Sequence, residues 1–167
     1  MNSAFDNDLY ELSQKVGESL KRYNHILGIA ESCTGGWIAQ AITMVPGSSM
    51  WFDSGFVTYS NQSKIKFLGV NETTIDQFGA VSKPVVEAMV KGVLRNTEAT
   101  CAVATTGIAG PDGGTKDKPV GTVWISIGLT KYRIESTALT LTGDRNAIRY
   151  QTVIYTLKAL MDGLHDI

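Results

Sequence analysis

The sequence predicts a single α/β domain in which helices cover both faces of a mixed, mostly parallel sheet. Apolar runs at residues 25–30, 51–59 and 100–105 have the length and composition of buried strands. Segments with helical periodicity separate these runs along the chain, and this alternation is typical of three-layer α/β/α domains. The 167 residues contain no internal repeat or linker, so one domain over residues 1–167 is expected.

Helices are predicted from the spacing of apolar residues and from residues that typically begin a helix. Leu9, Leu12 and Val16 recur at helical spacing in the first of them. Thr34 and Ser82 are placed to cap the N-termini of the second and the fourth. The expected helices are residues 8–23, 36–44, 63–68, 82–96 and 143–164.

Two further strands, residues 121–129 and 133–141, are predicted to form a hairpin that turns at residues 130–132. A hairpin joins antiparallel strands, which is why the sheet is expected to be mixed rather than wholly parallel. The segment 106–119 that precedes the hairpin is rich in glycine, proline and polar residues, and it is predicted to be a loop.

Composition and charge argue against several classes of protein. The formal net charge is −1 and no basic run is present, so neither a nucleic-acid-binding module nor a nucleic-acid partner is expected. No apolar segment is long enough to cross a bilayer, and residues 1–8 are polar and acidic, unlike a signal peptide. Cys33 and Cys101 lack the spacing of metal ligands, so a metal-free protein of the reducing cytoplasm is expected.

Residues 106–114 form a glycine-rich segment whose backbone amides could approach a phosphate closely. The segment is not a P-loop, because no Gly-Lys-Ser/Thr sequence closes it. It is not a dinucleotide-binding fingerprint either, because Pro111 interrupts the helix entry. No cofactor is therefore expected, and the segment is either an ordinary turn or part of a substrate site.

Three segments are predicted to lie beyond the carboxyl ends of parallel strands, where open α/β sheets bind their ligands: residues 31–36, 60–64 and 105–114. Ser32 follows the first buried strand, where amides of the next turn can face a developing oxyanion. Ser32 is therefore a candidate nucleophile. The alternative is that Ser32 and Thr34 only cap the following helix.

A serine nucleophile needs a base. His25 begins a strand and His165 lies close to the C-terminus, and neither is paired with an orienting carboxylate, so a Ser-His-Asp triad is not favoured. A lysine can serve instead if burial keeps its amine neutral. Lys64 and Lys66 both follow the second strand, and their spacing does not distinguish them from each other or from solvated helix lysines.

Two other residues near these segments carry chemistry. Cys33 is a rival nucleophile, but no histidine lies near it in the sequence and a buried structural cysteine is the commoner case. Arg145 stands at the start of a helix, where the helix dipole disfavours a cation. An arginine in that position either meets an anion or pairs with Asp144 or another acidic group.

Seven segments, in order along the chain, resemble the CinA C-terminal domain family, whose stand-alone members include nicotinamide mononucleotide deamidases. Together they span roughly residues 9–160. The segments are 30–36 (Ala-Glu-Ser-Cys-Thr-Gly-Gly), 46–49 (Pro-Gly-Ser-Ser), 55–61 (Gly-Phe-Val-Thr-Tyr-Ser-Asn), 79–82 (Gly-Ala-Val-Ser), 106–114 (Thr-Gly-Ile-Ala-Gly-Pro-Asp-Gly-Gly), 118–124 (Lys-Pro-Val-Gly-Thr-Val-Trp) and 143–145 (Gly-Asp-Arg).

The resemblance implies hydrolysis of the carboxamide of nicotinamide mononucleotide to nicotinic acid mononucleotide and ammonia, in the recycling of pyridine nucleotides. It implies that Ser32 is the nucleophile and that Lys64, rather than Lys66, is its base. It also brings in Tyr59, which would hold the lysine or relay a proton. The implied substrate-binding residues, which include those of the oxyanion site, are Cys33, Thr34, Gly35, Gly36, Ser48, Thr105, Thr106, Gly107 and Arg145.

The resemblance further implies a homo-oligomer, with a dimer favoured, and no membrane partner. Thr105 departs from the family pattern, because many relatives have an apolar residue at that position. The larger relatives also carry an N-terminal nucleotide-pyrophosphatase-like domain, for which the segment before the first predicted helix leaves no room. Two alternatives to an enzyme are a non-catalytic nucleotide-sensing module and an interaction domain associated with competence.

Overall fold

The computed structural model describes residues 3–130 and 133–165. A short 3₁₀ turn, η1 (Ser48–Met50), precedes the second strand. The helices are α1 (Ser3–Arg22), α2 (Trp37–Thr43), α3 (Asn61–Leu68), α4 (Glu72–Phe78), α5 (Lys83–Asn96) and α6 (Arg145–His165). The strands are β1 (Leu27–Glu31), β2 (Phe52–Val57), β3 (Cys101–Gly107), β4 (Thr122–Gly128) and β5 (Ile134–Thr140).

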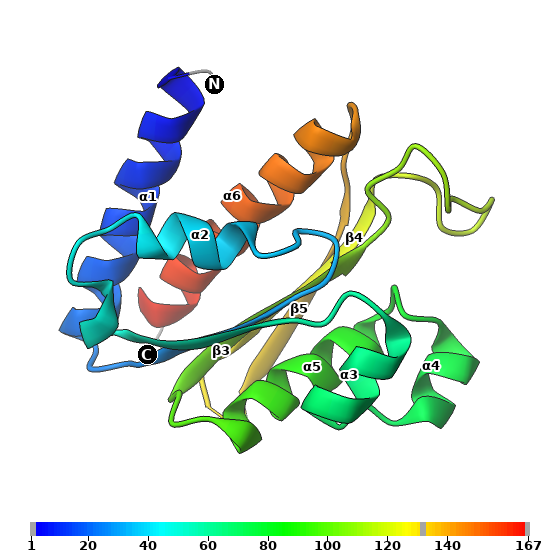
Figure 1. Ribbon diagram of the computed structural model, residues 1–167, viewed down its shortest axis with the longest axis horizontal. Helices are drawn as coiled ribbons and strands as arrows, with labels where there is room; N and C mark the ends of the chain where they lie inside the picture. The colour runs from blue at the N-terminus through cyan, green and yellow to red at the C-terminus, as the bar shows by residue number, and fades with distance from the viewer. Residues whose placement is uncertain (1–2, 131–132, 166–167) are drawn as a thin grey trace.

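The five strands form one mixed sheet in the order β2-β1-β3-β4-β5. β1 pairs in parallel with both β2 and β3, while β4 pairs antiparallel with β3 and with β5. Helices α1, α2 and α6 lie on one side of the sheet and α3, α4 and α5 on the other (Figure 1). The predicted three-layer α/β/α fold is therefore confirmed.

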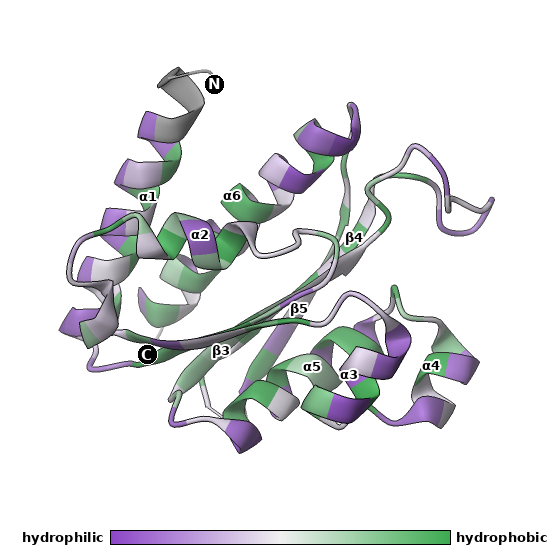
Figure 2. Cartoon of the chain, in the orientation of Figure 1, coloured by the Kyte–Doolittle hydropathy of each residue, from purple (hydrophilic) through white to green (hydrophobic). Residues whose placement is uncertain are grey.

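Each face of the sheet packs against its own apolar cluster. On the side of α1 and α6, Leu27, Ile29 and Val103 from the strands pack with residues such as Leu20 and Leu157 from the helices, all of them buried. On the other side, small strand residues such as Ala30 and Ala104 pack against α5. Figure 2 shows the loop after β3 as largely hydrophilic.

The alternation of side chains along β1 determines where its last residue points. Leu27 and Ile29 belong to the cluster under α1, α2 and α6, whereas Ala30 belongs to the cluster under α5. Because side chains alternate between the two faces of a strand, Glu31 faces the same side as Leu27 and Ile29. Its buried carboxylate accordingly lies at the N-terminus of α2, where it accepts from the amides of Ile38 (3.1 Å) and Ala39 (2.9 Å).

This geometry corrects the prediction that Thr34 caps α2. The N-cap residue is Gly36, in the left-handed conformation with φ 96°. The Glu31 carboxylate caps the N-terminus of the helix, where it also accepts from the amide of Gly36. A carboxylate satisfies several free amides and complements the helix dipole, which a threonine hydroxyl does less well. Thr34 instead forms a buried hydrogen bond with Thr105 (Oγ1–Oγ1, 2.9 Å).

Three other predictions on the elements differ from the structure. Helix α4 was not predicted, although Asn71 caps it by accepting from the amide of Thr73 at 3.0 Å. Helix α3 begins two residues earlier than predicted because Ser60 is its N-cap, accepting from the amide of Ser63 at 3.1 Å. The N-cap residue Ser82 of α5 makes no capping hydrogen bond with its side chain. The predicted hairpin turn includes residues 131–132, which lie outside the described residues.

Candidate active site

The carboxyl ends of β1, β2 and β3 surround a cavity of about 210 Å³. β1 is flanked by β2 on one side and by β3 on the other, so the cavity lies where the strand order changes direction, as is usual for ligand sites in open α/β sheets. It is lined by Ser32, Cys33, Tyr59, Asn61, Lys64, Ala80, Val81, Thr106, Gly107, Ala109 and Arg145.

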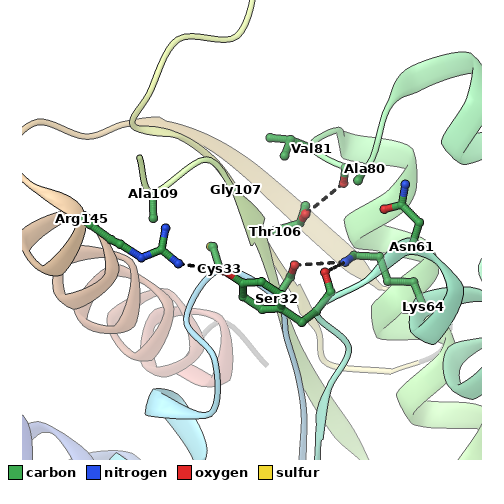
Figure 3. Close-up of a pocket in the computed structure, with 11 residues that line it drawn as sticks. Ser32, Cys33, Asn61, Lys64, Ala80, Val81, Thr106, Gly107, Ala109 and Arg145 are labelled. Atoms are coloured by element: carbon green, nitrogen blue, oxygen red, sulfur yellow. Dashed lines mark hydrogen bonds between the residues drawn. The ribbon is translucent and has the colours of Figure 1, made fainter. Parts of the chain in front are cut away.

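Ser32 and Lys64 meet in this cavity. Nζ of Lys64 lies 3.0 Å from Ser32 Oγ, and the two side chains point toward each other (Figure 3). Ser32 is held in place because its amide donates to the carbonyl of Thr105 on β3, at 3.1 Å. Lys64 projects from the second turn of α3, whose start is fixed by the Ser60 cap. Two residues that are distant in the sequence are thus in hydrogen-bonding contact.

The environment of Lys64 favours a neutral amine. Its side chain is only 1% exposed, and burial lowers its pKa to about 8. Nζ also donates to the carbonyls of Thr58 (2.8 Å) and Tyr59 (3.3 Å). Nζ donates to Ser32 Oγ in this arrangement, and once the amine is neutral its lone pair can instead accept the proton of the Ser32 hydroxyl. No carboxylate among the described residues forms a salt bridge with Lys64.

The turn after Ser32 leaves two backbone amides available. The amide of Gly35 donates to the carbonyl of Ser32 (3.0 Å), and the amide of Gly36 donates to the Glu31 carboxylate (3.0 Å). Within the part of the chain that the structure describes, the amides of Cys33 and Thr34 donate no hydrogen bond. Of the four amides expected to hold an oxyanion, only these two are therefore free to do so.

Arg145 stands on the opposite side of the cavity from Lys64 (Figure 3). Its Nη1 donates to the carbonyl of Gly110 (2.7 Å), and its Nη2 donates to the hydroxyl of Tyr59 (2.8 Å). The alternative partner Asp144 instead caps α6, accepting from the amide of Ala147 (2.8 Å). No described carboxylate forms a salt bridge with Arg145, so its charge is available to an anion.

Tyr59 takes a different position from the one expected. It was expected to hold the lysine, but only its main-chain carbonyl contacts Lys64, while its phenol hydroxyl contacts Arg145. The side chain is 58% exposed and lines the cavity. Its aromatic ring is therefore available to a ligand, and its hydroxyl is bound on the arginine side.

The end of β3 contributes to the cavity through Thr106 and Gly107. Thr106 Oγ1 donates to the carbonyl of Ala80 (2.9 Å), which joins the end of β3 to the segment before α5. A Cβ on Gly107 would lie 2.6 Å from Cγ2 of Val123, so only glycine fits there. Thr105 is buried against Thr34 behind the cavity wall. Thr34, Gly35, Gly36 and Thr105 thus adjoin the cavity without lining it.

Ser48 does not belong to this site within one chain. It lies in η1, just before β2, and β2 runs parallel to β1 with Phe52 beside Leu27 at the start of both strands. The segment before β2 is therefore at the amino edge of the sheet, whereas Ser32 is at the carboxyl edge. The prediction that Ser48 helps to hold the oxyanion is wrong for this reason.

Among the described residues, the rival candidates Cys33, His25, His165 and Lys66 form no hydrogen bond with the Ser32 hydroxyl. Burial raises the pKa of the Cys33 thiol to about 12, so the thiol stays protonated although it lines the cavity. His25 and His165 bind the hydroxyls of Thr100 and Tyr23, at 3.0 and 3.1 Å. The exposed Lys66 lies over the ring of Phe67 instead of reaching Ser32.

Sequence reasoning missed several residues that build the site. Asn61 lines the cavity one turn before Lys64, and its place in the Tyr-Ser-Asn segment was a signal that could have found it. Ala80, Val81 and Ala109 have no reactive group, but they lie in segments 79–82 and 106–114, which carry the family resemblance. Among the described residues, no group of three His, Cys, Asp or Glu side chains could hold a metal ion. None of the described helices combines the length and the hydrophobicity needed to cross a membrane.

The sequence is similar to a known family and to enzymes with a named activity. The family model of the CinA C-terminal domain matches residues 9–164. The chain is 48% identical to nicotinamide-nucleotide amidohydrolase PncC of Escherichia coli (strain K12), over 93% of this chain and 94% of that protein. It is 53% identical to the protein of the same name from Pseudomonas putida, over 90% of this chain and 93% of that protein.

Solved structures share the whole fold. Competence/damage inducible protein CihA from Agrobacterium tumefaciens has a TM-score of 0.88 at 39% sequence identity, over 95% of this chain and 96% of that chain. A competence-damaged protein (CinA) superfamily protein from Klebsiella pneumoniae has a TM-score of 0.90 at 34% identity, over 95% and 99%. These proteins therefore share the layered α/β fold at whose carboxyl edge the cavity of this chain lies.

Proposed function

The chain belongs to the CinA C-terminal domain family, and we propose that it hydrolyses the carboxamide of nicotinamide mononucleotide to nicotinic acid mononucleotide and ammonia. Two relatives about half identical to this chain, each aligned over nearly its whole length, are named nicotinamide-nucleotide amidohydrolases. The observation that best supports this reaction is the 3.0 Å contact between Ser32 Oγ and the buried amine of Lys64, because it pairs a nucleophile with a base.

In the proposed reaction, neutral Lys64 removes the proton from Ser32 Oγ as the oxygen attacks the amide carbon. The protonated lysine then gives that proton to the nitrogen, which leaves as ammonia, and an ester on Ser32 remains. A water molecule attacks the ester with Lys64 again as base, and this step releases the carboxylic acid and restores the serine. The hydrogen bonds to the Thr58 and Tyr59 carbonyls keep Nζ aimed at Ser32 throughout.

The negative charge of the tetrahedral intermediate needs donors beside Ser32. The amides of Cys33 and Thr34 are the two in the following turn that have no other partner among the described residues. Removal of one such donor typically lowers the rate by about 100- to 1,000-fold. We therefore assign the oxyanion site to these two amides.

The far side of the cavity suits the phosphate of the nucleotide. Arg145 presents a guanidinium without a carboxylate partner among the residues described, and a guanidinium binds phosphate through paired, charge-assisted hydrogen bonds. Thr106 and Gly107 line the cavity at the end of β3. We also propose that the enzyme serves pyridine-nucleotide recycling in the cytoplasm and acts as a homo-oligomer, as the family resemblance implies.

The test is ammonia release from nicotinamide mononucleotide without added metal ion. We expect activity in the native protein and a loss of at least about 1,000-fold in Ser32→Ala and in Lys64→Ala, because each removes a reacting group. Lys66→Ala, which removes an exposed lysine of the same helix, is the matched control and keeps its activity. An inert native protein, or full activity in both site variants, would overturn the proposal. Calorimetric binding of the nucleotide with no product over hours would instead indicate a sensing module.

A further inference from the structure

Arg149 contacts the turn that follows Ser32 (residues 33–36) from outside the cavity. It lies on α6, one turn after Arg145, and it does not line the cavity. Its Nε donates to the carbonyl of Cys33 (3.1 Å), and its Nη2 donates to the carbonyl of Thr34 (2.8 Å). We infer that Arg149 is a positioning residue that orients the oxyanion-binding amide of Thr34. This inference rests on the proposed function.

The geometry of the peptide bond links the contacts of Arg149 to the direction of the Thr34 amide. In a trans peptide the C=O and N–H groups point in opposite directions. The Cys33 carbonyl and the Thr34 amide belong to one peptide, so a carbonyl held toward Arg149 turns that amide away from Arg149. The next peptide is held in the same way: the Thr34 carbonyl meets Arg149, and the Gly35 amide reaches the Ser32 carbonyl at 3.0 Å. One guanidinium thus fixes two consecutive peptides of the turn.

The local structure holds the guanidinium in place for this task. Its carbon lies 5.2 Å from the centre of the Trp37 ring, on which it stacks. No described carboxylate forms a salt bridge with it, so its charge is directed at the two carbonyls. A donor on a carbonyl also polarises the N–H of the same peptide, which strengthens that N–H as a donor to an oxyanion. Gly35 has φ 62°, a left-handed conformation that favours glycine, and a Cβ there would only touch Nη2 of Arg149, at 3.4 Å.

The kinetic test compares Arg149→Met and Arg149→Lys with the native enzyme, using nicotinamide mononucleotide. After correction for the folded fraction, we expect kcat to fall about 100-fold in Arg149→Met while KM changes less than about threefold. Arg149→Lys keeps the charge but cannot bridge two carbonyls with a planar fork, so its kcat is expected to fall about tenfold. Added guanidinium ion, unlike ammonium, is expected to restore part of the kcat of Arg149→Ala.

Two controls separate this role from a merely structural one. Arg145→Ala, one turn away on the same helix, is expected to raise KM instead of lowering kcat. The apparent pKa of the rate profile should stay near that of native enzyme in Arg149→Met, because Lys64 is untouched. A corrected kcat within threefold of native in Arg149→Met, or full activity in Arg149→Lys, would overturn the inference.

A measurement that does not depend on catalysis tests this inference separately from the proposed function. Arg149→Met should show microsecond-to-millisecond exchange at the Thr34 amide in NMR relaxation dispersion, because the peptide is no longer held. The same amide should stay rigid in the native protein and in Arg145→Ala. A rigid Thr34 amide in Arg149→Met overturns the inference even if the native protein hydrolyses nothing, and an inert native protein alone overturns only the proposed function.

Discussion

At the scale of single residues, the burial of one amine decides what the cavity can do. Lys64 is among the largest fully buried side chains of the protein, and no described acid pairs with it. An ordinary lysine is charged at neutral pH and cannot remove a proton, whereas an amine with a pKa near 8 is partly neutral there. The reactivity proposed for Ser32 therefore depends on the environment of Lys64.

This dependence predicts the pH profile of the enzyme. Lys64 acts as a base only when neutral, and its pKa of about 8 makes the neutral form dominant above that pH. We expect kcat/KM for nicotinamide mononucleotide to rise about tenfold per pH unit below pH 8 and to level off above it. The check is ammonia release between pH 5.5 and pH 10, within the range where the protein stays folded. A rate that falls as pH rises through 8 would contradict Lys64 as the base.

Arg145 makes a second prediction at this scale. Arg145→Ala removes a guanidinium that has no carboxylate partner among the described residues, so we expect KM for the mononucleotide to rise about 10- to 100-fold, in line with a lost charge-assisted hydrogen bond. KM for the phosphate-free nucleoside should change much less. Arg22→Ala, which removes an exposed arginine at the end of α1, is the control. Equal effects on both substrates would remove the phosphate-binding role.

At the scale of elements, α2 and β1 are joined by a single carboxylate. Glu31 is 1% exposed and accepts hydrogen bonds from the amides of Gly36, Ile38 and Ala39, at 2.9 to 3.1 Å. These bonds close the turn that begins at Ser32, so the start of α2 and the turn after Ser32 are both held by Glu31. The same carboxylate complements the positive end of the α2 dipole.

Glu31→Gln tests this anchor. An amide keeps one acceptor oxygen but turns an NH2 group toward backbone N–H groups, which leaves some of them unsatisfied in a buried place. We expect a loss of roughly 2–3 kcal/mol in the free energy of unfolding, measured by urea denaturation, together with a lower kcat. Glu72→Gln, at the exposed first turn of α4, is the matched control. Unchanged stability in Glu31→Gln would show that the carboxylate does not cap α2.

At the scale of the whole molecule, the packing of both helical layers on the sheet offsets the folding free energy that is lost when the Lys64 amine is buried. Apolar clusters on the two faces supply the stability, since buried apolar area is the main favourable term in folding. Lys64 works against it, because the folded state disfavours the charged form that the unfolded chain carries. The proposed base Lys64 is therefore a local destabilising element in a stable fold.

The sign of this effect gives a prediction on stability. The folded pKa of Lys64 is about 8, against an ordinary value of 10.5, so between these pH values the folded protein binds fewer protons than the unfolded chain. The free energy of unfolding of native protein, relative to Lys64→Met, should therefore rise with pH from 8 to 10.5, by up to about 3 kcal/mol. Denaturant titrations across that range check it, with Lys66→Met as the control. A flat difference would contradict the lowered pKa.

Much of the fold was predictable because its signals are local. Short apolar runs, helical periodicity and the glycine-rich loop placed five of the six helices and all five strands close to where the structure has them. Helix α4 was missed because it is only seven residues long and contains two adjacent threonines, which have low helix propensity. The capping of α2 was mispredicted because the group that accepts from its first amides, the Glu31 carboxylate, lies at the end of the preceding strand.

Local sequence patterns indicated the layered α/β class, a serine after the first strand and two candidate lysines, and the family resemblance then pointed to Lys64. The folded structure shows that Lys64 contacts Ser32, that Ser48 lies at the other edge of the sheet, and that Arg149 donates to two carbonyls of the turn after Ser32. The physical reason is that periodicity and capping act between neighbouring residues, whereas contact between side chains depends on strand order and crossover connections. The catalytic roles of Ser32 and Lys64 stay predictions for the experiments above.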